Sequence, residues 1–213
     1  MKVTGIQVGE LETNCYIYRD ESTGRCAIID PGEMNDRLRA AIEEAGRASF
    51  DYILLTHCHF DHVGGVSEVR ELTGAPVAIQ KHDAAGLRDS GINLSGYFFG
   101  QRTIYPPADL TFDDGETFYV GETKFTVMHT PGHTVGSCCY ITEGLIFSGD
   151  TLFRESAGRT DFPGGSASEM SRSLQRLMAL EGDYIVYPGH EGVTTLSNER
   201  VNNPYVRWFG QNH

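Results

Sequence analysis

Four side chains that bind metal ions well stand within six residues of one another: His57, His59, Asp61 and His62. They follow a short apolar segment, residues 52–56, that is typical of a buried strand. Side chains alternate along an extended chain, so His57, His59 and Asp61 are expected to point the same way. His62, at the start of the next helix, can turn inward as a fourth donor. Imidazole nitrogens and carboxylate oxygens are ligands that zinc accepts, so this spacing predicts a metal site.

The carboxylate in this set helps to decide which kind of metal site it is. A closed zinc site that only staples loops is usually built from four Cys and His ligands, whereas Asp61 favours an open site that keeps a water molecule. Cys58 lies between the first two histidines, and by the same alternation it is expected to point away from the metal.

Three further donors occur just beyond other expected strands. They are His133 in a Pro-Gly-His-Thr sequence, Asp150 in Ser-Gly-Asp-Thr, and His190 in Pro-Gly-His. Taken singly, each is typical of ordinary turn chemistry. Asp30, which precedes Pro-Gly, fits a turn cap and a partner that orients a ligand histidine equally well.

The elements that must position these donors alternate between β-rich and helical segments. Two β-rich stretches, each followed by helices, indicate two packed sheets covered by helices on the outside. The helix that follows residues 150–166 is opened by a predicted capping box of Ser166 and Glu169. Strands are expected over residues 13–19, 25–30, 52–56, 76–80, 124–129, 137–142, 145–148 and 184–187, and helices over residues 34–46, 63–72 and 81–89, with a short tail after His190.

Two loops could form the wall of a site. Residues 90–108 show neither a helical nor a strand period, and a long loop of this kind is typical of a lid or wall. Its aromatic side chains, Tyr97, Phe98 and Phe99, are candidate pocket walls, with a small core beneath the loop as the equal alternative. In the second loop, Arg159 is a candidate substrate contact, or else it forms a local ion pair with Asp161.

Composition restricts the partners and the compartment. The chain has 213 residues, 17 basic and 29 acidic side chains, and a net charge of −12 with neutral histidines. This charge disfavours binding to nucleic acid or anionic lipid, and no apolar run approaches the ~20 residues of a membrane-spanning helix. The first residues lack the pattern of a secretory signal, so we expect a cytoplasmic protein acting on a small molecule. Five cysteines without CxxC spacing are expected to be free thiols. The oligomeric state is left open.

Together, the seven donors resemble the metallo-β-lactamase fold hydrolases, whose HxHxDH signature matches residues 57–62 and whose companion residues match in order and rough spacing. The resemblance implies a mixed α/β (α+β) fold, an αββα sandwich of two mixed β-sheets flanked by helices, with a dinuclear site at one edge. It implies two divalent ions, with zinc expected and iron or manganese as alternatives, which share a bridging hydroxide. By position, His57, His59 and His133 would hold the first ion and Asp61, His62 and His190 the second, with Asp150 bridging both.

Within that family, residues 158–165, 194–200 and 203–205 are similar to those of short glyoxalase II-like proteins. The resemblance implies hydrolysis of a small thioester or ester by the hydroxide, with Asp61 and Asp150 as the catalytic carboxylates. Only 23 residues follow His190. We therefore expect one domain over residues 1–213, without the C-terminal helical domain that supplies much of the glutathione-binding surface in full-length glyoxalase II. That departure, and the charge of Glu191, argue against glutathione thioesters.

Two rival functions remain open at this stage. Persulfide dioxygenases share the Gly-Arg-Thr-Asp segment at residues 158–161 and use one Fe(II), which His57, His133 and Asp150 would hold as a two-His, one-carboxylate triad. The other rival is a non-catalytic metal-binding module that keeps the fold. The complete ligand set argues against it, since binding alone would not require two adjacent cations around a shared water.

Overall fold

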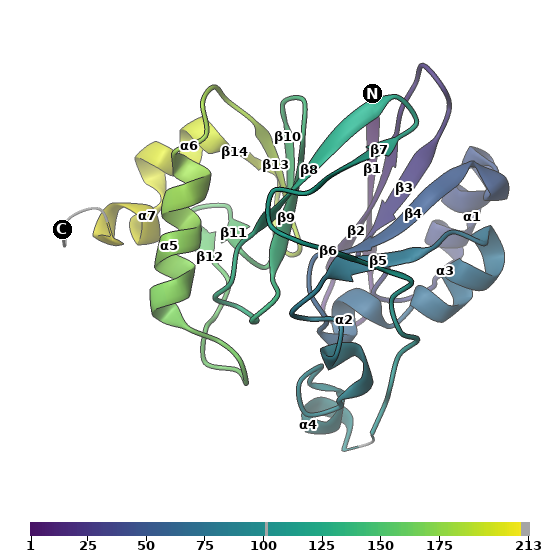
Figure 1. Cartoon of the computed structure of the whole chain (residues 1–213), viewed down its shortest axis with the longest axis horizontal. Helices are drawn as coiled ribbons and strands as arrows, with labels where there is room; N and C mark the ends of the chain where they lie inside the picture. Colours follow the sequence, from purple (N-terminus) through teal and green to yellow (C-terminus); the bar gives the residue numbers. More distant parts are fainter. Residues whose placement is uncertain (101, 210–213) are drawn as a thin grey trace.

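Two six-stranded sheets face each other and carry helices on their outer faces (Figure 1). The computed structural model of the chain describes residues 1–100 and 102–209, with the backbone alone for Phe99 and residues 207–209. The layers run helix, sheet, sheet, helix, which confirms the expected αββα sandwich of two mixed sheets.

The first sheet holds the N-terminal strands in sequence order. Its first three strands are paired antiparallel, and from β3 onward neighbouring strands run parallel. Parallel strands place their carboxyl ends at the same edge of the sheet, so segments that leave β4 and β5 begin near each other. The strands are β1 Lys2–Val8, β2 Thr13–Arg19, β3 Cys26–Ile29, β4 Phe50–Leu55, β5 Val77–Gln80 and β6 Leu110–Phe112.

The second sheet has the order β14-β13-β10-β9-β8-β7. Because β9 is antiparallel to both β8 and β10, and β13 is parallel to β10, the strands β8, β10 and β13 all point the same way. A separate two-stranded hairpin, β11 Leu152–Phe153 and β12 Ser156–Ala157, follows β10. The sheet strands are β7 Thr117–Val120, β8 Thr123–His129, β9 Cys138–Thr142, β10 Leu145–Gly149, β13 Ile185–Pro188 and β14 Thr194–Thr195.

Aromatic side chains fill the space between the two sheets. Tyr18 of β2 meets Phe125 of β8 edge to face, with ring centroids 4.9 Å apart, and Phe147 of β10 stacks beside Phe125. Successive residues of a strand face opposite sides, so Cys138 lies in this central core while Cys139 faces the outer helices. All five cysteines are free, as expected from their spacing.

The outer helices bury one apolar face each. Helix α1, Asp36–Ala45, and helix α3, Val66–Thr73, pack on the first sheet, whereas α5, Ala167–Met178, and α6, Leu196–Asn202, pack on the second. Asn35 caps α1 as an acceptor for a backbone N–H of its first turn. The remaining helices are α2 Phe60–Val63, α4 Ser95–Phe99, α7 Pro204–Phe209 and the 3₁₀ turns Arg47–Ser49 and Gly86–Arg88.

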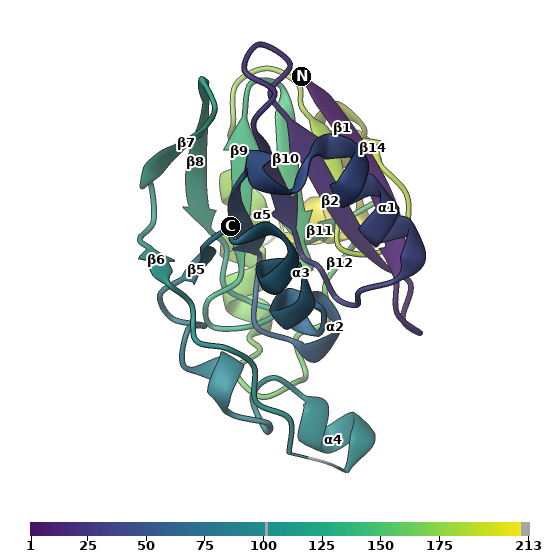
Figure 2. The same cartoon turned by 90° about the vertical axis from the view of Figure 1, so that its right-hand side faces the viewer.

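Several sequence expectations about the helices are wrong in detail. The helix expected over residues 63–72 is divided into α2 and α3, because Gly64 and Gly65 pack directly against the backbone of residues 31–34. Residues 81–89 form turns and one 3₁₀ turn rather than a helix. Residues 90–108 contain α4, which lies away from the sandwich in both views (Figures 1 and 2). The tail after His190 forms β14, α6 and α7.

Only one of the two hydrogen bonds of the expected capping box of α5 is present. The Ser166 hydroxyl accepts from the Glu169 N–H, as expected, but the Ser166 N–H donates to the carbonyl of Gly132. The Glu169 carboxylate pairs with Arg172 instead. None of the helices in the described part of the chain has the length and apolar character needed to cross a bilayer.

Candidate metal centre

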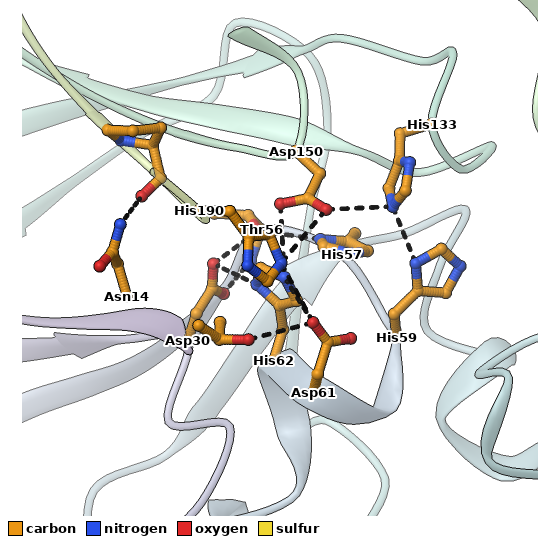
Figure 3. A network of polar contacts seen from close by, with 12 residues as sticks. Asn14, Asp30, Thr56, His57, His59, Asp61, His62, His133, Asp150 and His190 are labelled. Carbon is orange, nitrogen blue, oxygen red and sulfur yellow. Dashed lines mark hydrogen bonds and ion pairs between the residues drawn. The ribbon is translucent and has the colours of Figure 1, made fainter. Parts of the chain in front are cut away.

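The structure brings all seven sequence-predicted donors together at one edge of the sandwich, between the two sheets (Figure 3). The first four follow β4, the strand at the middle of the first sheet. The other three each follow one of the three strands of the second sheet that point the same way, β8, β10 and β13. The fold therefore brings the donors of residues 57–62 next to three donors that lie 70 or more positions later in the chain. The donors are His57, His59, Asp61, His62, His133, Asp150 and His190.

The first four donors do not all reach the site by strand alternation. Strand β4 ends at Leu55, the chain bends at Thr56 and His57, and α2 begins at Phe60. Asp61 and His62 therefore approach from the first turn of a helix, and the alternation expected for Asp61 is wrong. Cys58 points away from the cluster into the core of the first sheet, as expected.

The donor atoms lie close enough for pairs and triplets to share a cation. His133 Nε2 lies 2.9 Å from His59 Nδ1, and Asp61 Oδ2 lies 3.2 Å from His190 Nε2 and 3.4 Å from His62 Nε2. Three groups have ligand atoms within 4.8 Å of one another, and two of them are the groups that the family resemblance assigns to the two ions. The groups are His57, His59 and His133; His57, His62 and Asp150; and Asp61, His62 and His190.

Several buried polar atoms of the cluster have no hydrogen-bond partner, as is expected of atoms that bind a metal ion. His57 Nε2, His59 Nε2, His62 Nε2 and Asp150 Oδ1 are buried without a hydrogen-bond partner. A buried polar atom without a partner costs free energy, and such atoms are rare in folded proteins unless an ion or water satisfies them. Three of these atoms, on His57, His62 and Asp150, belong to one of the donor groups and fit a divalent cation, whereas His59 faces His133 with its Nδ1.

A ring of other groups holds the donors in position. Asp30 Oδ2 lies 3.0 Å from His62 Nδ1 and also accepts from the Thr56 hydroxyl, so it orients the imidazole. The Thr13 hydroxyl donates to Asp61 Oδ2 at 3.0 Å. His133 Nδ1 lies 2.7 Å from the carbonyl of Arg159, which leaves its Nε2 to face the cluster. Such contacts fix the tautomer and the ring orientation of a ligand.

Their surroundings lower the pKa of two of the clustered histidines and raise the pKa of a third. Burial and neighbouring imidazoles hold the pKa of His57 well below its ordinary value, and they lower the pKa of His59 to about 3. Burial also disfavours a charge on His62, but the carboxylates of Asp61 and Asp150 outweigh it and raise the pKa of His62. Uncharged imidazole offers a lone pair, which a metal requires.

Asp83 joins the loops of the two sheets and was not predicted from the sequence. Its carboxylate is buried, and it accepts from the Cys58 N–H at 3.0 Å, from the Thr134 hydroxyl at 2.7 Å and from the Gly136 N–H at 2.7 Å. Burial raises the pKa of Asp83, although these hydrogen bonds lower it. The residue thus ties the segment of His57 and His59 to that of His133.

A cavity of about 450 Å³ opens over the cluster. Phe98 and Arg159 line it, together with Phe153, Phe162 and Glu191. Arg159 also forms the expected local ion pair with Asp161, at 2.7 Å, and its guanidinium lies 4.0 Å from the centre of the Phe162 ring.

Of the aromatic residues expected to line the site from the 90–108 loop, Phe98 lines the cavity and Tyr97 does not. Tyr97 is 77% exposed and does not line this cavity, and Phe98 is 46% exposed, so neither belongs to a buried core beneath the loop. The side chain of Phe99 lies outside the part of the structure that is described.

The sequence matches a known family over most of its length. A profile described as the Metallo-beta-lactamase superfamily matches residues 8–190, a range that includes all seven clustered donors. The chain belongs to this superfamily. A Bacillus subtilis protein named "Probable metallo-hydrolase YqgX" is 33% identical over 212 residues, which cover 98% of this chain and 99% of that protein.

Solved structures of superfamily proteins share the fold. BLEG-1 B3 metallo-beta-lactamase is 34% identical with a TM-score of 0.86, covering 96% of this chain and 99% of that one. TTHA1623, solved in a di-iron-bound form, is also 34% identical, with a TM-score of 0.82 and coverage of 95% and 99%. ETHE1 from Myxococcus xanthus is 27% identical, with a TM-score of 0.77 and coverage of 99% and 91%.

Two histidines of the described residues lie outside the cluster, and His213 lies beyond the described part of the chain. The rings of His82 and His129 stack on each other, with centroids 5.2 Å apart, and His129 Nε2 lies 2.8 Å from the carbonyl of Val135. The sequence showed no partner for either residue, because the segments that carry them are 47 positions apart. Their mutual contact gives them a structural role at the surface.

Proposed function

We propose that the chain is a metal-dependent hydrolase of small thioesters or esters, similar to glyoxalase II. In this reaction water adds across the bond that breaks, with its hydroxyl going to the acyl carbon and its proton to the departing sulfur or oxygen. The observation that supports this most directly is that His57, His62 and Asp150 each have a buried potential ligand atom without a hydrogen-bond partner. Donors of this kind beside a cavity are what an open, catalytic metal site requires.

The proposed ligand assignment follows the groups of donors. Zinc is the metal we expect, with iron or manganese as alternatives, since availability as well as ligand type decides which metal binds. When bound, two such ions would lower the pKa of a shared water and polarise the substrate carbonyl. We assign His57, His59 and His133 to the first ion, Asp61, His62 and His190 to the second, and Asp150 to both.

The chain's own residues then position the reactants. The polar partners of Asp61 in the described structure all meet its Oδ2, so Oδ1 is the oxygen that can hold the attacking water in place. Asp150 shares this role through its Oδ1, which has no hydrogen-bond partner and lies 3.4 Å from His62 Nε2. The rings of Phe98, Phe153 and Phe162 line the cavity and exclude bulk water from the reacting centre.

The wider setting of the activity is also part of the proposal. We infer one domain over residues 1–213, acting in the cytoplasm on a small molecule. The net charge of −12 favours neither nucleic acid nor an anionic membrane as a partner.

The test is a turnover assay with protein whose metal content has been measured. We expect two metal ions per chain and hydrolysis of simple thioesters. His59→Ala and Asp61→Ala should each lower kcat at least about 100-fold, the usual minimum for losing such a group. Wild-type turnover in either variant at full metal loading would overturn the mechanism. Absence of turnover on thioesters, lactones, phosphodiesters and persulfides would favour the non-catalytic module.

A second candidate is a mononuclear Fe(II) persulfide dioxygenase. The likeness to ETHE1 supports it. Its two-imidazole, one-carboxylate ligand set would be His57, His133 and Asp150: His133 Nε2 lies 3.4 Å from Asp150 Oδ2, and His57 shares one donor group with His133 and another with Asp150. One iron per chain, with oxygen uptake that depends on a persulfide, would favour this candidate over the hydrolase.

A further inference from the structure

A second cavity, of about 570 Å³, lies beside the cavity over the metal-ligand cluster. The two cavities share four lining residues, Leu11, Phe60, Asp61 and Phe98. The metal-side cavity is also lined by Asp150, whose buried Oδ1 lacks a hydrogen-bond partner. A substrate whose reacting carbonyl lies at the cluster can therefore extend an arm past Asp61 into the second cavity.

Carboxylates surround this second cavity. Glu10, Glu33 and Glu68 line it and are exposed, and they are its negative charges, since Asp61 on the shared wall is assigned to the second ion. Its described lining residues include no Lys, Arg or His, and within the described part of the chain none of the three glutamates forms an ion pair. Clefts lined by one sign of charge raise the local concentration of ligands of opposite charge.

The remaining walls suit an organic cation rather than a metal ion. Leu11, Met34, Phe60 and Phe98 contribute apolar or aromatic surface. Tyr105 adds a half-buried phenol ring. Aromatic faces attract quaternary and protonated amines, which carboxylates nearby reinforce.

We propose that this second cavity, which we name the acidic cavity, binds the departing arm of the substrate and selects arms that carry an ammonium group over arms that carry a carboxylate. The inference rests on the proposed thioester hydrolysis and specifies its substrate class. We assign the departing arm because Asp61, on the shared wall, belongs to the ligand group of the second ion and not to the group that contains His59 and His133. Anionic thiols are disfavoured by the same carboxylates.

The test compares three acetyl thioesters of similar shape on the metal-loaded protein. Acetylthiocholine carries a trimethylammonium group, 3,3-dimethylbutyl thioacetate is its uncharged isostere, and S-acetyl-3-mercaptopropionate carries a carboxylate. We expect kcat/KM to fall in that order, with at least about a 10-fold difference between the cation and the anion at low ionic strength. The difference should shrink in 1 M salt, where the Debye length is only about 3 Å.

Variants separate the acidic cavity from the overall charge of the protein. The triple variant Glu10→Gln, Glu33→Gln and Glu68→Gln should reduce the cation-to-anion ratio at least about 5-fold, as expected when three nearby charges are removed. The matched control removes three exposed glutamates elsewhere and should keep the wild-type ratio. Its substitutions are Glu44→Gln, Glu143→Gln and Glu181→Gln.

The outcomes of these assays distinguish failure of this inference from failure of the proposed function. Equal kcat/KM for the three thioesters, or an equal loss of selectivity in both triple variants, would overturn the acidic cavity while the hydrolase stands. A preference that follows charge on the acyl side instead would overturn the assignment to the departing arm. If no thioester is turned over, calorimetry with the thioether analogues, in which CH₂ replaces the carbonyl, tests binding directly: tighter binding of the ammonium thioether supports the inference, and equal binding overturns it.

Discussion

Asp30 connects the end of the first sheet to a candidate ligand through one carboxylate. Its Oδ1 accepts from the Thr56 N–H at 2.8 Å, and its Oδ2 contacts both the Thr56 hydroxyl and His62 Nδ1. The backbone of Asp30 has a φ of 52°, in the left-handed region where Asp and Asn are the non-glycine residues most easily tolerated. The sequence left a turn cap and a ligand-orienting role open, and the side-chain contacts favour the second.

Asp30→Asn isolates the charge of this residue, because Asn fits the same backbone conformation. We expect metal affinity to fall about 10- to 100-fold, the usual effect of losing a partner that orients a ligand histidine. Competition with a chromogenic chelator measures the affinity. Asp113→Asn, which removes a charge from an exposed ion pair with Lys81, is the control and should bind metal as wild type does. Equal affinity in both variants would contradict an orienting role for Asp30.

Gly189, next to the candidate ligand His190, has no room for a side chain. A Cβ there would lie 2.3 Å from Asp150 Oδ1 and 2.7 Å from His62 Cε1, whereas a Cβ at Gly192 meets nothing within 4 Å. We therefore expect Gly189→Ala to displace candidate ligands and to lower the metal content of purified protein, with Gly192→Ala as the matched control. Elemental analysis of both variants measures this. Full metal content in Gly189→Ala would show that the cluster does not hold the metal as assigned.

Asp83 links two segments of the chain. The three groups that donate hydrogen bonds to its carboxylate lie in the segments that follow β4 and β8. Asp83→Asn keeps the size of the side chain but replaces one acceptor oxygen with an NH₂ donor. At least one buried donor then loses its acceptor, which costs about 1–3 kcal/mol of unfolding free energy. Urea unfolding of the metal-free protein measures that cost, and metal titration measures the effect on the site. Asp113→Asn again serves as the control, and an unchanged midpoint in Asp83→Asn would contradict the bridging role.

The sequence predicted the donors better than the contacts around them. His57, His133, Asp150 and His190 each follow a strand, and their residue types alone limit their chemistry. Asp83 could not be found in this way, because its partner Thr134 is 51 positions away and nothing local distinguishes it from other polar residues.

The short helices were missed for related reasons. Helix α4 has only five residues, too few to show a helical period. The interruption between α2 and α3 depends on Gly32, a distant residue whose carbonyl would lie 2.3 Å from a Cβ on Gly64. In the second case tertiary packing, and not local propensity, decides where the helix ends.

The site also joins the two halves of the molecule. Four candidate ligands belong to the segment after β4, and three belong to loops of the second sheet, so the ions would cross-link the sheets at their shared edge (Figure 3). Without them the cluster holds several buried polar atoms that lack hydrogen-bond partners, which costs free energy in the folded state. Metal binding should therefore stabilise the whole fold and not only the site.

Removing the metal should lower the thermal stability of the chain by a predictable amount. A ligand at 100 times its Kd stabilises the folded state by about 2.7 kcal/mol, which for a protein of this size corresponds to a Tm shift of about 5–10 °C. Calorimetry of chelated and reloaded protein measures the shift, which should grow with the logarithm of free metal concentration. His82→Ala with His129→Ala, outside the cluster, should keep the shift, whereas His57→Ala should lose most of it. A Tm that is unchanged after the metal has been removed, as verified by elemental analysis, would mean that the two sheets are held together without the ions.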